Sequence, residues 1–205
     1  MNETYIITIG RQLGSGGKEI GNRLSKILNI PCYDKELLHL ASKESGVQST
    51  FFEDADEKNS FSVLDALSSF WEGDFFTNNY LSNESLFQIQ SDVIQKLAHK
   101  QSCIFVGRCA DYVLRSHPRL LSVFITAATE DRVATMAHAE HISKEKAQTL
   151  IEQTDKKRAA YYDYFSNKVW GAAKSYDLCI NTSTFGIEQS VNTIVNLVRE
   201  QFSLS

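Results

Sequence analysis

A glycine-rich segment near the start of the chain limits the possible folds more than any other feature of the sequence. The segment runs from Thr8 to Leu24, reads TIGRQLGSGGKEIGNRL and contains five glycines and one lysine. It follows the apolar residues of YIITIG and leads into an apolar stripe with helical spacing, formed by Ile20, Leu24, Ile27 and Leu28. A strand, a glycine-rich turn and a helix in this order aim backbone N–H groups and the positive end of the helix dipole at one point. The segment therefore predicts an anion-binding turn at the end of a buried strand.

Apolar runs and helical patterns alternate along the rest of the chain. The expected strands are Tyr5–Ile9, Pro31–Tyr33, Cys103–Val106, Leu121–Ile125 and Asp177–Ile180, all short and apolar enough to be buried in a parallel sheet. The helical patterns after the glycine turn include KELLHLASKE, which follows the second strand, and residues 85–100, 130–140, 144–165 and 187–201. This alternation predicts an α/β fold, in which helices cover both faces of a parallel sheet.

One segment, residues 46–83, interrupts the alternation. It contains Trp71 and five phenylalanines between Phe51 and Phe75, and it has no strong strand pattern. This aromatic content is too high for a disordered linker, so the segment predicts an inserted helical subdomain or a lid. Within it, Phe75 and Phe76 are candidates for a contact in a homo-oligomer.

Bulk composition restricts the partners of the protein. The chain has 205 residues, a net charge of −4 and 42% hydrophobic residues, which fits one folded domain. An acidic chain does not attract nucleic acid or anionic membranes through its overall charge, so any anion must be bound by local groups. The sequence shows no signal-type leader, no apolar run of membrane-spanning length and four cysteines without a C-x-x-C pair. We therefore expect a cytoplasmic protein with reduced thiols.

The glycine turn has the chemistry of a phosphate-binding loop. Lys18 stands at the start of the helix, where it could reach the outer phosphates of a nucleoside triphosphate. The match to G-x-x-x-x-G-K-[ST] is imperfect, because Gln12 stands at the first glycine and Glu19 at the hydroxyl position that normally ligates Mg²⁺. The dinucleotide-binding fingerprint fits less well, since its last glycine is missing. A glycine turn without a ligand is the alternative.

Polar residues follow two further strands. Asp34 and Lys35 follow the second strand, and Arg108 follows Gly107 after the third, with Asp111 one turn on. Ligands of open α/β sheets bind at these carboxyl ends of the strands, and arginine binds a phosphate through two parallel hydrogen bonds. The purely structural alternatives are a helix cap for Asp34 and a surface position for Arg108.

A late segment, TDKKRAAYYDYF, presents Asp155, Lys156, Lys157 and Arg158. These residues could form a solvated helix face. Together with the glycine turn and the strand ends, however, they supply a donor cradle, an acceptor site and neutralising cations. Those are the parts that a phosphoryl transferase needs.

Several segments, in this order, resemble the cytidylate kinase-like family, which is related to the P-loop nucleoside monophosphate kinases. The matching segments are RQLGSGGKEIG, IPCYDKELL, CIFVGRCADYVL, FITAATEDRV, DKKRAAYYDYF and YDLCINTSTFGIEQSV. The resemblance implies a three-layer P-loop NTPase fold with a five-stranded parallel sheet. It divides the chain into a CORE of about 1–45, 84–140 and 170–205, an NMP-binding insertion of about 46–83 and a LID of about 141–169. It implies transfer of a phosphoryl group from ATP, with Mg²⁺, to CMP or dCMP.

The resemblance also suggests roles for individual residues. Residues expected at the ATP are Gly14, Ser15, Gly16, Gly17, Lys18, Glu19, Arg132 and Thr182. With the strand-end and late-segment residues, the expected acceptor site comprises Asp34, Lys35, Arg108, Asp111, Asp155 and Lys157. Lys18, Arg108 and Arg158 are the residues expected to act on the transferred phosphoryl group.

The chain departs from the family pattern at two positions that matter for function. The kinase motif D-G-R-D reads Val106-Gly107-Arg108-Cys109 here, so a metal-holding carboxylate and a base-reading carboxylate are both replaced. Glu19 is then the candidate ligand of Mg²⁺, and Asp111 the candidate reader of the base. Two alternatives follow from the departures: a nucleotide-binding sensor without catalysis, and a P-loop kinase for another small molecule.

Overall fold

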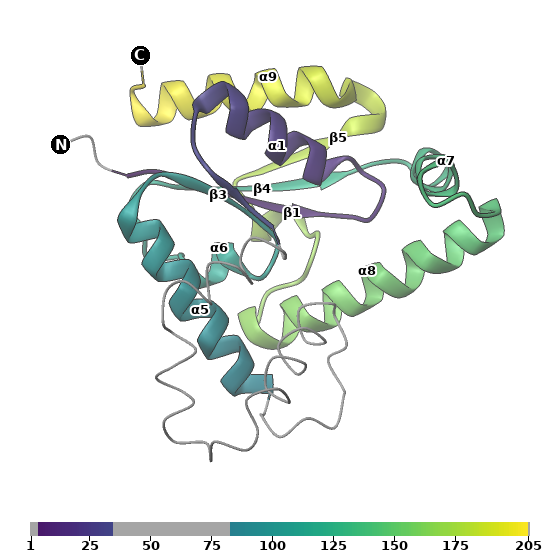
Figure 1. Cartoon of the computed structure of the whole chain (residues 1–205), viewed down its shortest axis with the longest axis horizontal. Coiled ribbons are helices and arrows are strands. Elements are labelled where there is room, and N and C mark those ends of the chain that lie inside the picture. Colours follow the sequence, from purple (N-terminus) through teal and green to yellow (C-terminus); the bar gives the residue numbers. More distant parts are fainter. Residues whose placement is uncertain (1–3, 35–82, 205) are drawn as a thin grey trace.

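The structure is a computed structural model that describes residues 4–34 and 83–204 (Figure 1). Five parallel strands form its sheet in the order β2-β3-β1-β4-β5. They are β1 (Ile6–Arg11), β2 (Cys32–Tyr33), β3 (Cys103–Val106), β4 (Leu120–Thr126) and β5 (Leu178–Asn181). The predicted α/β fold with a five-stranded parallel sheet is thereby confirmed.

Helices cover both faces of the sheet (Figure 1). One face carries α1 (Gly17–Leu28) and α9 (Thr182–Phe202), and the other carries α5 (Asn83–Lys100) and the short α6 (Ala110–Val113). Two helices, α7 (Thr129–Ala139) and α8 (Lys144–Ser166), follow β4, and a short 3₁₀ helix, η1 (Ala173–Ser175), precedes β5. The predictions for residues 35–82, including Lys35 and the aromatic insertion, lie outside the described residues.

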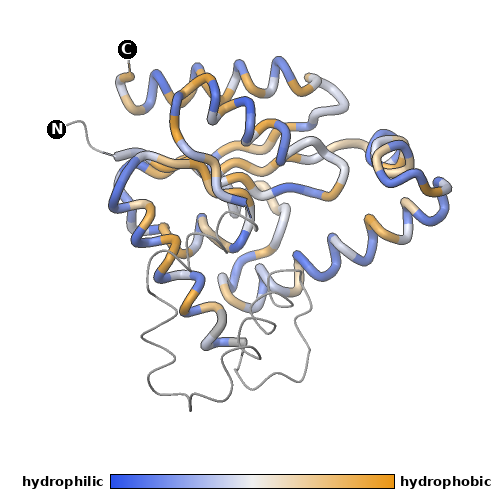
Figure 2. Tube along the Cα trace, viewed as in Figure 1, coloured by the Kyte–Doolittle hydropathy of each residue, from blue (hydrophilic) through white to orange (hydrophobic). Residues whose placement is uncertain are grey.

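Alternate residues of β1 face the two layers of the core. Ile7 and Ile9 pack with Ile20 of α1 and Ile194 of α9, whereas Ile6 packs on the α5 side. Figure 2 shows the result as hydrophobic strands enclosed by helices with hydrophilic outer surfaces. Within the described ranges, no helix has the length and apolar character needed to cross a bilayer.

The central strand β1 is longer than its apolar run. The sequence predicts an end at Ile9, but hydrogen bonding with β4 continues as Gly10 pairs with Phe124 and Arg11 with Ile125. The carboxyl end of β1 therefore carries an arginine into the crevice between the strand ends, before the glycine turn begins. At the sheet edge, Cys179 of β5 is exposed, while the other three cysteines are buried.

Candidate active site

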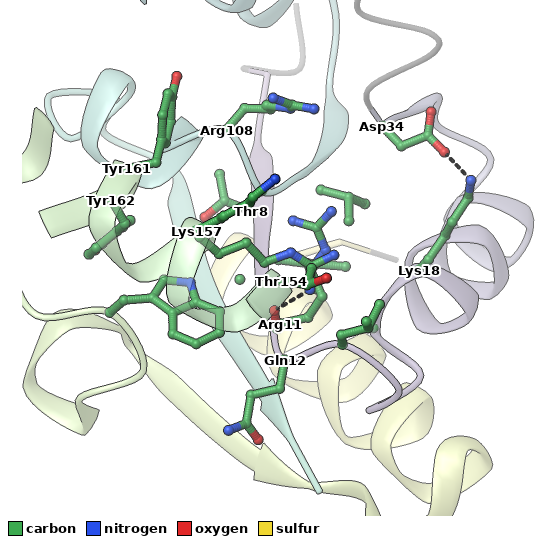
Figure 3. A pocket seen from close by; sticks show the side chains of 18 of the residues that line it. Thr8, Arg11, Gln12, Lys18, Asp34, Arg108, Thr154, Lys157, Tyr161 and Tyr162 are labelled. Atoms are coloured by element: carbon green, nitrogen blue, oxygen red, sulfur yellow. Dashed lines mark hydrogen bonds and ion pairs between the residues drawn. The ribbon is translucent and has the colours of Figure 1, made fainter. Parts of the chain in front are cut away.

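A cavity of about 520 Å³ opens at the carboxyl ends of the strands (Figure 3). The loop after β1, the ends of β2 and β3, α8 and the segment before β5 all contribute to its wall. Predicted site residues in this wall are Gly14, Gly16, Gly17, Lys18, Glu19, Asp34, Arg108, Asp111, Lys157 and Arg158. Ser15, Arg132, Asp155 and Thr182, which were also predicted, lie outside the wall and hold its parts together.

The glycine loop has the backbone that an anion cradle requires. Gly14 and Gly16 have φ values of 79° and 82°, in the left-handed region that favours glycine. A Cβ at Gly14 would lie 2.9 Å from the backbone oxygen of Arg132. Gly16 caps α1 without a side-chain hydrogen bond, so no side chain of the cap occupies the N–H groups of the first turn. These N–H groups can bind an anion such as a phosphate group.

Side chains from distant elements fix the shape of this loop. The Leu13 N–H donates to Asp155 Oδ1 at 2.9 Å, and the Thr182 hydroxyl donates to the carbonyl oxygen of Ser15 at 2.9 Å. The buried Ser15 hydroxyl donates to the carbonyl oxygen of Gln12 at 2.8 Å. Gln12 in turn accepts from the Thr126 hydroxyl through its side-chain oxygen. In this structure, Ser15 and Thr182 therefore stabilise the loop from within.

Asp155 joins the loop to α7 and α8. Its second carboxylate oxygen lies 2.8 Å from Arg132 Nη2, and these side chains are 14% and 5% exposed. Arg158 Nη1 lies 3.8 Å from Asp155 Oδ1. Burial raises the pKa of Asp155, while the Leu13 N–H and Arg132 act in the opposite direction. Arg132 and Asp155, predicted to contact ATP and the acceptor respectively, are paired with each other and position α8 against the loop.

Lys18 and Asp34 face each other at one end of the cavity. Lys18 Nζ lies 2.8 Å from Asp34 Oδ2 (Figure 3). The lysine side chain is 59% exposed, whereas that of Asp34 is 14% exposed. The pair thus links the start of α1 to the end of β2, with a solvent-accessible ammonium group beside the glycine cradle.

The backbone after β3 turns sharply into the cavity. Gly107, Arg108 and Cys109 have successive φ values of 78°, 63° and 52°. Left-handed conformations strain residues other than glycine, and such strain is concentrated at functional sites. The Gln90 amide holds the turn by donating to the Arg108 carbonyl oxygen at 3.1 Å. Burial raises the pKa of the Cys109 thiol, so the residue at the family's base-reading position is a neutral, buried side chain.

Arg11 lies in the same wall, although its sequence position did not lead us to predict a role for it. Its carbonyl oxygen accepts a hydrogen bond from Arg158 Nη1 at 3.2 Å. Burial lowers the pKa of its guanidinium, and Arg158 and Arg108 lower this pKa further. The sequence contained one usable signal, because Gly10-Arg11 at the end of β1 repeats the Gly107-Arg108 pair at the end of β3.

The inner part of the cavity is lined by aromatic and polar groups. The aromatic residues are Tyr161, Tyr162, Trp170 and Tyr176, none of which was predicted to contact a ligand. Tyr162 donates a hydrogen bond of 2.7 Å to Asp111 Oδ2. Thr8 also lines the cavity, and its buried hydroxyl has no hydrogen-bond partner among the described residues. This part of the wall therefore offers the Asp111 carboxyl group and the hydroxyl groups of Thr8 and the three tyrosines among aromatic rings.

We expect Asp111→Asn to raise stability at neutral pH and to flatten its dependence on pH. Asp111 is 8% exposed and burial raises its pKa, although the Tyr162 hydrogen bond lowers it in part. The folded state therefore holds this proton more tightly than the unfolded state, and stability falls as the pH rises from about 4 through the raised pKa. Asparagine keeps an acceptor for Tyr162 and removes the charge. Urea unfolding of both proteins between pH 4 and pH 8 measures the difference. Parallel pH profiles would contradict this account of Asp111.

The site contains no preformed metal centre within the ranges 4–34 and 83–204, where no three His, Cys, Asp or Glu side chains converge. Glu19 is 52% exposed and lies 2.5 Å from Arg23 Nη2 on the next turn of α1. Asp34 is paired with Lys18. A single carboxylate with phosphate oxygens and waters is a usual environment for Mg²⁺, so either Glu19 or Asp34 could supply a protein ligand.

Comparison with solved structures identifies relatives of this fold. A protein from Eubacterium ventriosum, titled uncharacterized, superposes with a TM-score of 0.73 at 24% identity, covering 95% of this chain and 98% of that one. A gluconokinase from Sinorhizobium meliloti gives a TM-score of 0.54 at 12% identity, covering 100% and 99% of the two chains. A shikimate kinase from Bacteroides thetaiotaomicron gives 0.53 at 13% identity, covering 95% and 98%. These similarities show a shared P-loop kinase fold.

Sequence comparison is more specific than the structural similarity. Curated protein sequences gave no significant match. The model of the cytidylate kinase-like family, in contrast, matches residues 6–184, which include the glycine loop, the strand ends and α8. The chain therefore belongs to the cytidylate kinase-like family.

Proposed function

We propose that this protein transfers the γ-phosphoryl group of ATP to a nucleoside monophosphate, with CMP and dCMP as the first candidates. The observation that carries this proposal is the convergence of two kinds of phosphate ligand on one cavity. The glycine loop and Lys18 approach from β1 and α1, while Arg108, Lys157 and Arg158 approach from β3 and α8. Membership of the cytidylate kinase-like family supports the same reaction class.

The proposed chemistry depends on alignment and charge. A phosphate oxygen of the acceptor is already a nucleophile, so the transfer needs no strong general base. The glycine loop would hold the donor, and Lys18 would neutralise charge that develops on the transferred group. Arg108 and Arg158 would orient the acceptor phosphate for in-line attack. Mg²⁺ bound with ATP would shield the phosphate charges further.

Two features of the structure suggest how the site would close. The helix α8 carries Lys157 and Arg158 into the wall, and it lies within the proposed LID of about 141–169. Asp155 on the same helix binds the glycine loop. Because Asp155 already ties α8 to the glycine loop, movement of the rest of the proposed LID over the bound substrates would exclude water.

The identity of the acceptor depends on the inner wall. Cys109 cannot accept a charge-assisted hydrogen bond as an aspartate would, and Asp111 already binds Tyr162. Recognition of cytosine by Asp111 would require exchange of that hydrogen bond. These substitutions favour a P-loop kinase with a different acceptor as the second candidate. The absence of a carboxylate at Val106 favours a non-catalytic nucleotide sensor as the third.

A coupled assay of ADP release tests the three candidates. It would be run with ATP and Mg²⁺ across CMP, dCMP, UMP, AMP and GMP, with gluconate and shikimate as acceptors that lack a phosphate. We expect turnover confined to CMP and dCMP. Turnover with another acceptor would identify that acceptor as the substrate in place of CMP and dCMP. ATP binding without turnover in the whole panel would favour the nucleotide sensor.

A further inference from the structure

We propose that Arg11 is a direct ligand of the acceptor and forms, with Arg108 and Arg158, a site for a dianionic phosphate monoester. This inference rests on the proposed phosphotransferase function and deepens it, because it adds a third arginine to the site for the acceptor phosphate. It also assigns a binding role to Arg11, which lies at the end of β1, before Gly14 and Gly16 of the glycine loop.

The course of the Arg11 side chain places it between the donor and acceptor sides. A Cβ at Gly17 would lie 2.5 Å from Arg11 Cβ, so the side chain starts beneath the first turn of α1. A Cβ at Gly107 would overlap Arg11 Nη1, so the guanidinium ends against the backbone that follows β3. Two glycines therefore make room for one arginine. Figure 3 shows Arg11 in the same cavity as Lys18 and Arg108.

Two arginines and two carboxylates act on the charge of Arg11. Arg108 and Arg158 are close enough to disfavour its charged form, and both act on its pKa in the same direction as burial. Asp34 and Asp155 act on this pKa in the opposite direction, but Asp34 pairs with Lys18, and Asp155 pairs with Arg132 and lies 3.8 Å from Arg158. Within the described residues, the Arg11 guanidinium makes no hydrogen bond or ion pair. A dianion between the three guanidinium groups would offset their repulsion.

A phosphate monoester suits this site better than a carboxylate or a neutral alcohol. Its charge at neutral pH is between −1.5 and −2, as for phosphorylated side chains, and its oxygens accept the paired hydrogen bonds of several guanidinium groups. A carboxylate carries one charge and two oxygens, so it satisfies a single arginine fork. Donor phosphates have their own ligands in the first-turn N–H groups of α1 and in Lys18. Arg11 points away from that turn, toward Gly107.

Titration of inorganic phosphate into the ADP-saturated protein tests the proposal without assuming an acceptor. Isothermal titration would compare the wild type, Arg11→Gln, Arg11→Lys and the control Arg199→Gln. Arg199 is an exposed arginine of α9, so its replacement makes the same charge change outside the cavity. We expect Arg11→Gln to raise the phosphate dissociation constant about 10- to 100-fold. Arg11→Lys should give an intermediate value, and ADP affinity should change less than about twofold.

Each other outcome has a defined meaning. Equal phosphate affinity in the wild type and Arg11→Gln would overturn the role of Arg11 and leave the proposed function standing. Loss of ADP affinity in place of phosphate affinity would assign Arg11 to the donor and also overturn the proposal. If the wild type binds no phosphate, the dianion site is rejected; if no phosphate-bearing acceptor turns over as well, the proposed function fails with it. Thermal unfolding checks the fold, and Arg11→Lys keeps the test valid if Arg11→Gln is unstable.

Discussion

Replacement of Lys18 by alanine is expected to lower kcat/KM for phosphoryl transfer about a thousandfold. This is the upper end of the effect expected when one preorganised charge is removed from a transition state. Lys18 stands at the start of α1 beside the glycine cradle, and its ammonium group pairs with Asp34 at one end of the cavity. The transferred phosphoryl group carries more spread charge in the transition state than in the bound substrate. The loss should therefore appear mainly in kcat.

The variant should fold normally because the Lys18 side chain is 59% exposed. Lys26→Ala is the matched control, since Lys26 is an exposed lysine in the last turn of the same helix. Thermal unfolding of all three proteins, followed by steady-state kinetics with the best acceptor of the panel, separates folding from chemistry. Turnover of Lys18→Ala near that of Lys26→Ala would remove Lys18 from the mechanism.

The fold was predictable because its signals are local. Each strand of the core is a short apolar run, and the longer helices follow predicted helical patterns, so pattern and structure largely coincide, although the short α6 was not predicted. The glycine loop was predictable for the same reason. Gly14 and Gly16 stand between a buried strand and a helix, where only glycine adopts the observed backbone without strain.

The roles of several site residues depend on contacts that no local pattern contains. Ser15 and Thr182 are 167 positions apart, yet the Thr182 hydroxyl binds the Ser15 carbonyl. Asp155 reaches back 142 positions to the N–H of Leu13. From the sequence, all three residues fit the description of ligands equally well. Their positions behind the wall follow from the packing of α8 and α9 against the loop.

Arg11 shows the opposite case, in which a site residue is hidden by its position in the sequence. The apolar run ends at Ile9, so Gly10 and Arg11 read as the beginning of a turn. Pairing with Phe124 and Ile125 of β4 extends the strand by two residues and fixes the direction of the arginine. Because this pairing is between segments more than 100 positions apart, it cannot be inferred from local propensity.

Replacement of Arg108 by glycine is expected to lower kcat/KM about 100- to 1,000-fold while leaving the protein at least as stable as Arg108→Ala. Arg108 lines the cavity, and its replacement would remove one of the proposed ligands of the acceptor phosphate. The backbone of Arg108 has a φ of 63°, which strains any residue with a Cβ. Glycine relieves that strain, so Arg108→Gly should be about 1 kcal/mol more stable than Arg108→Ala.

The two substitutions separate function from conformation. Both lack the guanidinium, so both should lose activity to the same extent, whereas only the alanine variant keeps the strained backbone. Arg115→Gln is a suitable control, because Arg115 is an exposed arginine just after α6 whose Nη1 donates to the Tyr112 carbonyl oxygen at 2.8 Å. Urea unfolding and ADP release would be measured on all four proteins. Activity retained in Arg108→Gly would show that the acceptor phosphate binds elsewhere. If Arg108→Gly were less stable than Arg108→Ala, the turn after β3 would not be strained. The expected combination, a stable but inactive protein, would mean that the arginine is held in an unfavourable backbone because the reaction requires its guanidinium there.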